Sequence, residues 1–380
     1  MADADFIPFM HEAIALAEKG RWRTYPNPTV GAVLVRDGKV VARGWHHAAG
    51  LDHAETDCLN NAASLGINTT GGTLVVTLEP CRHQGKTPPC TEAILKAGIA
   101  RVVIGTADPN PEAGGGAEVL RAAGVEVIEN VCQQECLDLV ADFLIWQKHK
   151  RPYVILKMAA TLDGRIATRN AHAQWISSEA SRKRTHTLRA GVGLCGGAVL
   201  VGGGTFRADN PRLTARDVDV ATQPLACILT SRLPQPDADF LLLKERPEQT
   251  IFLSSPAAAA STTAKALREI GVRVLALGSS IHGGPNFQGM LRIMFDDLHC
   301  PYVLCEGGGH LALTLLEADL VDEFHLHLAP MVLGDAEAIP IFSGRAPLSL
   351  DEALRMRVCD THICGGDVHI HLLSMHQTTL

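Results

Sequence analysis

A chain of 380 residues is long enough for about two domains, each with its own hydrophobic core. Its hydrophobic content of 46% and charged content of 20% are typical of a water-soluble globular protein. The formal net charge of −7 disfavours a nucleic-acid partner, because nucleic-acid-binding surfaces are normally basic. No apolar run reaches the roughly 18 residues of a membrane span, and the N-terminus lacks the basic start of a signal peptide. We therefore expect a cytoplasmic protein without nucleic-acid or membrane partners.

The first half of the chain predicts strands and helices that alternate after an opening β-hairpin. Apolar residues recur at helical spacing from Phe6 to Ala17, which predicts a helix over 6–20. Asp37-Gly38 is a strong turn signal between two apolar runs. We expect strands over 30–35, 40–44, 73–78, 101–105 and 125–128, and helices over 53–65, 89–97, 117–123 and 133–147. This order favours a three-layer α/β domain with a mostly parallel sheet.

A short basic run that ends in proline, Lys148–Pro152, precedes a second alternating series. We expect a domain boundary there, with one domain over 1–148 and another over 152–380. The second domain is expected to contain strands over 153–158, 198–201, 225–229, 251–253, 272–275, 302–305, 323–328 and 367–372, and helices over 264–270 and 311–318. This half of the chain is therefore also predicted to be α/β.

Eleven cysteines are scattered along the chain. In a reducing compartment, cysteines with well-matched partners indicate a metal site before a disulfide. Three close pairs have no histidine or further cysteine at ligand spacing: Cys132/Cys136, Cys300/Cys305 and Cys359/Cys364. We interpret nine of the eleven cysteines, these six among them, as small buried apolar residues. Cys81 and Cys90 are the exceptions.

Three short segments of the first half combine the residues that a catalytic zinc site needs. They are His53-Ala54-Glu55, Glu79-Pro80-Cys81 and Thr87-Pro88-Pro89-Cys90. Zinc binds nitrogen and thiolate ligands in a tetrahedron, and a catalytic site leaves the fourth position to water. His53, Cys81 and Cys90 supply three ligands, and the bound water becomes acidic enough to act as hydroxide near neutral pH. Glu55 is then the predicted proton carrier between this water and a departing amine.

Local structure favours each of these positions. His53 and Glu55 begin a predicted helix, and Cys81 follows a predicted strand. Cys90 lies in the first turn of a helix, where free backbone N–H groups and the helix dipole favour a thiolate. A closed structural zinc site with His83 as fourth ligand is the alternative, but it leaves Glu55 without a role.

The cysteine spacing distinguishes this chain from tRNA and cytidine deaminases. Those enzymes typically combine H-x-E with P-C-x-x-C, whereas eight residues separate Cys81 from Cys90 here. The run Pro80–Cys90, together with Pro26–Gly31, resembles the deaminase half of bifunctional riboflavin-biosynthesis enzymes over residues 5–148. The resemblance implies a cytidine-deaminase-like fold and Zn²⁺-dependent hydrolytic deamination of a diaminopyrimidinone that carries a phosphoribosylamino group. It also implies substrate contacts from Asn27, His46 and His83.

Motifs of the second half resemble, in the same order, the reductase half of these enzymes, which has a dihydrofolate-reductase-like fold. They are Tyr153–Arg165, Trp175–Ser178, Leu188–Ala190, Val201–Thr205, Ala208–Thr214 and Glu306–His310. The glycine run Gly307–Gly309 follows a predicted strand and precedes a helix, whose N-terminus favours a phosphate. A Rossmann fingerprint would open the first βαβ unit, so we expect a nucleotide site of another kind. A tight turn without ligand is the alternative.

The resemblance implies that the second domain reduces the ribosyl side chain to ribityl with NADPH. The implied cofactor contacts are Ala159, Trp175, Thr205, Asp209, Ser231, Gly308, Gly309, His310, Leu311, Ala312, Leu313 and Thr314. The implied contacts with the phosphorylated substrate are Arg189, Leu213, Arg216 and Glu306, and Asp209 is the candidate catalytic residue. Arginine suits a phosphate because its fork donates two parallel hydrogen bonds. A homo-oligomer is compatible with this assignment.

Several positions depart from the reductase pattern. Ala173 replaces a hydroxyl residue before the Gln-Trp pair, and Gly197 stands where a polar residue is common. The glycine-rich stretch Gly191–Gly197 is longer than usual, and Asn210 replaces the second acid of an Asp-Asp-Pro motif. One alternative is therefore a deaminase fused to a degenerate, regulatory second domain. An RNA-directed zinc deaminase is another, which the cysteine spacing and the acidic balance oppose.

Overall fold

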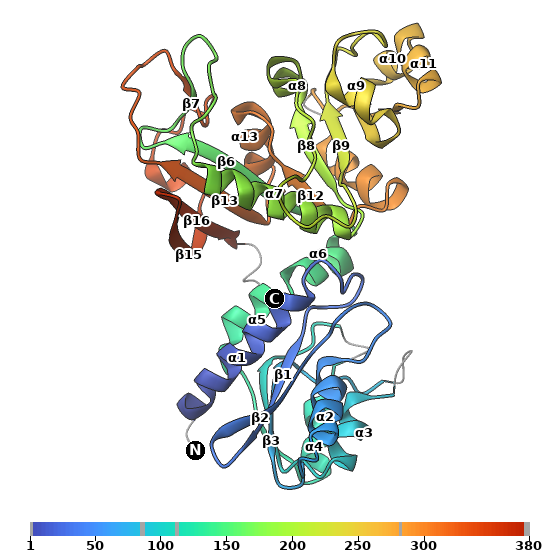
Figure 1. The fold of residues 1–380 in the computed structure, drawn as a ribbon, viewed down its shortest axis with the longest axis vertical. Coiled ribbons are helices and arrows are strands. Elements are labelled where there is room, and N and C mark those ends of the chain that lie inside the picture. Colours follow the sequence, from blue (N-terminus) through green and yellow to red (C-terminus); the bar gives the residue numbers. More distant parts are fainter. Residues whose placement is uncertain (1–2, 84–87, 111–113, 281–282, 376–380) are drawn as a thin grey trace. The chain divides into compact units, whose positions relative to one another are not determined.

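The computed structural model describes residues 3–83, 88–110, 114–280 and 283–375. Residues 84–87 of the run between the two cysteines, and the end of the second predicted domain at 376–380, lie outside the described residues. The described residues divide into two compact units, one over 3–149 and the other over 150–375 (Figure 1). Arg151, in the basic run at this boundary, is buried in an ion pair with Asp322 at 2.6 and 2.8 Å. This residue is therefore part of the second unit.

The first unit is built on a five-stranded sheet with the order β2-β1-β3-β4-β5. Its strands are β1 (Gly31–Arg36), β2 (Lys39–Trp45), β3 (Thr73–Leu78), β4 (Arg101–Thr106) and β5 (Glu126–Ile128). β3, β4 and β5 are parallel, whereas β1 is antiparallel to both β2 and β3. Asp37 and Gly38 form the hairpin turn with φ values of 50° and 70°, which the Asp-Gly sequence accommodates.

Helices cover both faces of this sheet, so that the unit has three layers. They are α1 (Ile7–Ala17), α2 (Ala54–Ser64), α3 (Cys90–Lys96), α4 (Gly116–Ala122), α5 (Gln133–Leu139) and α6 (Ala141–His149). Val33 and Val35 of β1 share one core with Met10 of α1, and Leu34 shares another with Cys58 of α2. This alternation along β1 is what a strand buried on both faces requires. The helix predicted over 133–147 is two helices, with Val140 between them.

The second unit is built on a nine-stranded sheet with the order β11-β10-β9-β8-β12-β6-β13-β16-β15. Its strands are β6 (Tyr153–Thr161), β8 (Ala198–Gly202), β9 (Leu225–Leu229), β10 (Thr250–Ser254), β11 (Arg273–Ala276), β12 (Tyr302–Cys305), β13 (Glu323–Ala329), β15 (Met356–Cys364) and β16 (Asp367–Ser374). β16 is antiparallel to β13 and β15, and the other neighbours are parallel. β7 (Arg165–Ala167) and β14 (Ile339–Pro340) form a separate pair.

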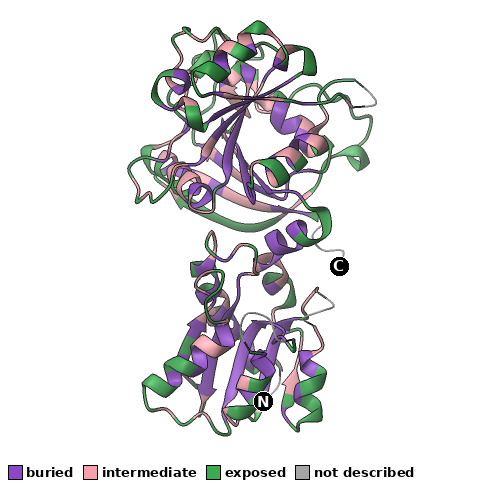
Figure 2. Cartoon of the chain, turned by 90° about the vertical axis from the view of Figure 1, so that its right-hand side faces the viewer, coloured by how far each residue is buried: buried purple, intermediate pink, exposed green. Residues whose placement is uncertain are grey.

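The helices of this unit are α7 (Glu179–Leu194), α8 (Gly203–Asp209), α9 (Leu241–Glu245), α10 (Pro256–Ala259), α11 (Thr262–Glu269), α12 (Phe287–Arg292) and α13 (Gly309–Glu317). Residues of α12 and α13 share a core with one face of the sheet, and α7 packs against β8 and β12. Figure 2 shows that the strands inside each unit are mostly buried. Within the described ranges, no helix has both the length and the apolar character that a bilayer span needs.

Three features differ from the sequence-based expectations. The first four residues of the stretch Gly191–Gly197 form the last turn of α7, a helix that was not predicted. A Cβ at Gly193 would lie 2.3 Å from the carbonyl oxygen of Thr222, so this close approach requires glycine. The edge strand β15 was not predicted, and Cys359 on it is exposed rather than buried. Cys132, Cys195 and Cys364 are only half-buried.

Candidate active sites

The first unit brings the three predicted zinc ligands together. His53 precedes α2, Cys81 follows β3 by three residues, and Cys90 is the first residue of α3. Nδ1 of His53 lies 3.6 Å from Sγ of Cys81 and 3.3 Å from Sγ of Cys90. Zn–S bonds of about 2.3 Å and Zn–N bonds of about 2.1 Å in a tetrahedron place nitrogen and sulfur about 3.6 Å apart. The observed spacing therefore fits one zinc ion with little movement of the ligands.

The two thiols are electrostatically suited to a cation. A hydrogen bond from the Cys90 thiol lowers the pKa of Cys81 to about 4, and His53 acts in the same direction. The backbone N–H of Cys90 donates to the same sulfur at 3.4 Å. The pKa of Cys90 is raised because its proton is held by Cys81 and because the side chain is buried. A second thiolate at this position needs a positive charge beside it, which a bound metal ion supplies.

Glu55 lies in the first turn of α2 with its side chain buried. Burial raises the pKa of Glu55 to about 7, and the opposing charge of His53 reduces this effect. The carboxylate lines the same cavity as His53 and Cys81. The geometry thus places a proton-accepting group beside the three ligands without making it one of them.

This cavity has a volume of about 390 Å³ and includes all three predicted substrate contacts of the first unit, Asn27, His46 and His83. Nε2 of His46 lies 3.0 Å from the Asn27 amide nitrogen, and Nδ1 lies 2.9 Å from the carbonyl oxygen of Asp52. Burial lowers the pKa of His46, which favours the neutral ring. Nδ1–H then donates to Asp52 and Nε2 accepts from Asn27, so the orientation of the Asn27 amide is fixed.

Glu79 has a positioning role that the sequence did not reveal. Its carboxylate accepts hydrogen bonds from the backbone N–H groups of Asp108, Gly115 and Ala117 at 3.1, 3.0 and 2.9 Å. These bonds hold Asp108 and the start of α4 against the strand end that leads to Cys81. Asp108 lines the same cavity, and burial raises its pKa to about 6. An acid directly after a strand of apolar residues and threonine, all of them buried, was the available signal for this role.

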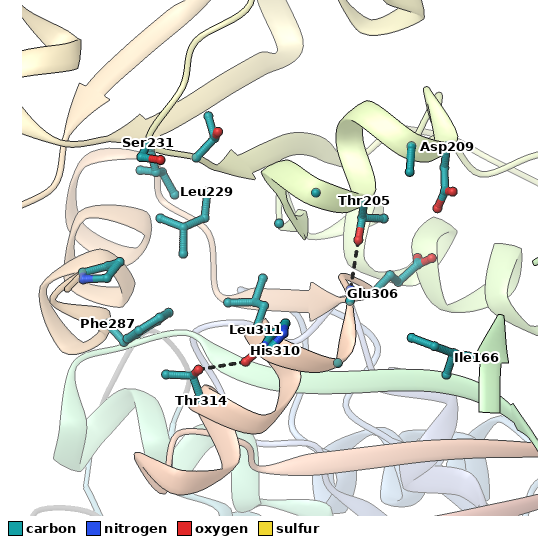
Figure 3. A pocket seen from close by; sticks show the side chains of 18 of the residues that line it. Ile166, Thr205, Asp209, Leu229, Ser231, Phe287, Glu306, His310, Leu311 and Thr314 are labelled. Carbon is teal, nitrogen blue, oxygen red and sulfur yellow. Dashed lines mark hydrogen bonds between the residues drawn. The ribbon is translucent and has the colours of Figure 1, made fainter. Parts of the chain in front are cut away.

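The second unit contains a larger cavity of about 920 Å³ (Figure 3). Figure 3 shows Thr205 and Asp209 of α8 and His310, Leu311 and Thr314 of α13 around it. The predicted residues that line the cavity are Ala159, Thr205, Asp209, Ser231, Glu306, Gly308, Gly309, His310, Leu311 and Thr314. Most of the predicted cofactor contacts therefore meet in one place, although they come from segments far apart in the sequence.

Three other predicted cofactor contacts do not line this cavity. Trp175 is 66% exposed, and the Arg182 guanidinium lies 4.4 Å from the centre of its ring. Ala312 and Leu313 are buried on α13, and Ala312 belongs to the core beneath the sheet. Ala312 and Leu313 are therefore buried in the protein rather than exposed in the cavity wall.

Glycine occupies the three positions of the 307–309 run for different structural reasons. A Cβ at Gly307 would lie 2.5 Å from the backbone nitrogen of Gly202, and a Cβ at Gly309 would lie 2.3 Å from the carbonyl oxygen of Ile341. Packing therefore requires both. At Gly308 the nearest atom is Oγ1 of Thr205 at 3.1 Å, which also accepts the Gly308 N–H at 3.0 Å. The tight-turn interpretation explains Gly307 and Gly309, whereas Gly308 faces the cavity.

The predicted substrate residues of the second unit are only partly in the cavity wall. Glu306 lines it, and Arg189 holds the Glu306 carboxylate through two hydrogen bonds of 2.7 Å. Burial alone would raise the pKa of Glu306, but the Arg189 charge outweighs this effect and holds the pKa below its usual value. Leu213 is buried and Arg216 is exposed, and neither lines the cavity.

Lys157 is a cavity residue that the sequence analysis missed. It lies in β6 and lines the cavity beside Ala159 and Glu306. Burial lowers the pKa of Lys157, and the charge of Glu306 opposes this effect. A lysine inside an otherwise apolar strand was the signal that could have identified it.

Comparison with known proteins assigns each unit to a protein family. Residues 6–106 match the cytidine and deoxycytidylate deaminase zinc-binding region, and residues 152–370 match the RibD C-terminal domain. The site geometry of the first unit agrees with the first match. The protein is therefore an α/β enzyme in which a deaminase unit is followed by a reductase unit.

The chain belongs to the RibD family, the bifunctional deaminase/reductases of riboflavin biosynthesis. It is 40% identical to the riboflavin biosynthesis protein RibD of Aquifex aeolicus, with 95% of this chain and 96% of the relative covered. The RibD of Escherichia coli (strain K12) is 36% identical, with coverage of 96% and 98%. A Thermotoga maritima diaminohydroxyphosphoribosylaminopyrimidine deaminase/reductase structure superimposes with a TM-score of 0.78, 34% identity and coverage of 98% and 100%. The family and fold class predicted from the sequence are confirmed.

Proposed function

We propose that this chain carries out two successive reactions on one phosphorylated pyrimidine. The first unit deaminates a diaminopyrimidinone that carries a phosphoribosylamino group, with Zn²⁺ held by His53, Cys81 and Cys90. The second unit then reduces the ribosyl side chain to ribityl with NADPH. The proposal rests on the tetrahedral spacing of the three ligands around a cavity that also contains Glu55. It implies a cytoplasmic enzyme whose partners are small molecules, without nucleic acid or membrane.

In the deaminase unit, bound zinc supplies an acidified water as the nucleophile. Glu55 accepts one proton of the water at its buried carboxylate and passes it to the amino nitrogen, the other proton of the water ends on the neighbouring ring nitrogen, and ammonia leaves as the carbonyl forms. The Asn27 amide, fixed by His46, orients the pyrimidine in the cavity. His83 lines the wall nearby and contacts the substrate.

In the reductase unit, NADPH supplies the hydride. The cavity side of Gly308, the Thr205 hydroxyl and the N-terminus of α13 receive the anionic part of the cofactor. The other cavity-lining residues, Ala159, Ser231 and Asp209, contact the remainder. Glu306 and Lys157 face the sugar, and Arg189 positions Glu306. Leu213 and Arg216 contact the phosphate where the substrate extends beyond the cavity.

Product analysis tests both reactions at once. The zinc-loaded full chain is incubated with the phosphoribosylated diaminopyrimidinone, with and without NADPH, and the products are analysed by mass spectrometry. We expect the deaminated compound without NADPH and the deaminated, reduced compound with it. Deamination without any reduction would support the degenerate second domain instead. A lack of deamination would contradict the zinc assignment.

A further inference from the structure

Histidines on two neighbouring strands, β13 and β16, form two rows across the reductase sheet, and none of them lines the cavity of this unit. β13 places His325 opposite His371 of β16, and β16 places His369 opposite His327. The rings of His325 and His371 are stacked with their centres 4.7 Å apart. Side chains that are directly opposite on neighbouring strands project from the same face of a sheet.

Glu323 completes a set of three possible ligands at one end of these rows. Its Oε1 lies 2.6 Å from Nε2 of His325 and 3.1 Å from Nε2 of His371. The three ligand atoms lie within 4.8 Å of one another. Nε2 of His371 is buried and, within the described residues, makes no hydrogen bond, although it lies close to the carboxylate. This nitrogen is therefore left with an unused lone pair or proton directed into the cluster.

We propose that Glu323, His325 and His371 form a second metal site, for a divalent transition-metal ion such as Zn²⁺. Two imidazoles and one carboxylate are a donor set that zinc uses, with water in the remaining position. Ligand bonds of about 2.0–2.2 Å require only that the side chains separate slightly around the ion. The side chains of His325 and His371 are 12% and 27% exposed, so an ion can reach the cluster from solvent.

The position of this site relates it to the reductase cavity. β13 is parallel to β6, with His325 opposite Lys157 and His327 opposite Ala159. Both Lys157 and Ala159 line the cavity. An ion bound across β13 and β16 therefore stabilises β13, the strand that pairs with the cavity-lining strand β6. Because the ion binds the folded unit, we expect it to raise the thermal midpoint of that unit.

Zinc stoichiometry of the full chain tests the proposal. After dialysis against Zn²⁺ and removal of free metal, elemental analysis is expected to find two zinc ions per chain. Cys90→Ser is expected to leave one ion, and His325→Gln combined with His371→Gln is also expected to leave one. His362→Gln is the matched control, because this partly exposed histidine lies on the adjacent strand β15, outside the ligand set. It is expected to retain both ions.

Either of two results would overturn the site: a wild-type chain that saturates at one ion, or a double histidine variant that still binds two. If circular dichroism shows that the double variant is unfolded, the site is tested on the wild-type chain instead. Zinc-soaked crystals are then expected to give an anomalous peak between Oε1 of Glu323 and the two imidazole nitrogens. Absence of that peak refutes the site. If Cys90→Ser lowers the zinc content and the double histidine variant does not, the proposed second site is refuted and the assignment of the deaminase ligands stands.

Discussion

The position of Glu55 in its site follows from the local sequence more directly than that of any other residue in the two sites. It follows His53 by two residues at the start of α2, and this short separation keeps both side chains at one end of the helix. His53, Cys81 and Cys90 were predicted from their residue types in three short motifs, and their places at the start of a helix or after a strand supported that prediction. By contrast, Arg189 and Glu306 are separated by 117 positions, and their pairing depends on how α7 packs against β12. No local pattern contains that information.

We expect Glu55→Gln to retain zinc and lose deamination. The amide is nearly isosteric but cannot accept the proton from the water, so kcat should fall by about 10²–10⁴-fold. Zinc content and the rate of ammonia release are measured on the same preparation. Glu92→Gln, at an exposed position in the first turn of α3, is the control and is expected to leave both unchanged. Unchanged turnover in zinc-loaded Glu55→Gln would remove this residue from the mechanism.

At the scale of elements, the sequence predicted those strands and helices that have a strong apolar period. Eight of the nine strands of the reductase sheet coincide with predicted ones. β15 was missed because it is an edge strand with most residues exposed, which leaves no apolar alternation to detect. α7 was missed because its sequence is polar and its last turn contains Gly191 and Gly193. Packing, rather than intrinsic propensity, determines its end.

The connection between β12 and α13 separates the roles of adjacent glycines. Gly308→Val adds bulk on the cavity side, and we expect it to weaken NADPH binding by about tenfold or more, which corresponds to about 1.4 kcal/mol. Gly307→Ala instead forces its Cβ against the backbone of Val201 and Gly202. We expect that variant to lose about 1–3 kcal/mol of unfolding free energy.

Cofactor titration and thermal unfolding of both variants distinguish these effects. NADPH affinity should fall in Gly308→Val, and its unfolding midpoint is measured on the same preparation so that loss of a cofactor contact is separated from loss of stability. Gly204→Ala is the control, because it also lines the cavity but has no atom near its Cβ position. If Gly308→Val reduces the sugar at the wild-type rate, the cofactor lies elsewhere.

The loop before α4 gives a second prediction at this scale. Glu79→Ala leaves the N–H groups of Asp108, Gly115 and Ala117 without their carboxylate acceptor. We expect a loss of about 1–3 kcal/mol, the cost of leaving buried polar groups unpaired. Zinc affinity should also fall, because Cys81 lies two residues further on. Urea unfolding and zinc titration measure both quantities, with Glu118→Ala at an exposed position as control. A variant as stable as the control would contradict this role.

At the scale of the whole molecule, no single motif predicted two sites in two units. The order of the motifs along the chain did. The described residues that line each cavity come from one unit alone. The departures at Ala173, Gly197 and Asn210 do not remove the second cavity. Ala173 lines it, and glycine at 197 permits close approach to the carbonyl oxygen of Tyr302. Asn210 ends α8 in the left-handed region, where asparagine is favoured over most residues.

This separation predicts that one activity survives loss of the other. Cys90→Ser removes a zinc ligand, and we expect deamination to fall by more than the roughly 10–100-fold that loss of an outer hydrogen-bond partner of a ligand costs. NADPH-dependent reduction of the already deaminated intermediate should continue near the wild-type rate, because Cys90 and the reductase cavity lie in different units. The variant should therefore accept the second substrate but not the first. Parallel assays with both compounds measure this difference, and equal loss of both reactions in a folded variant would show that the two sites depend on each other.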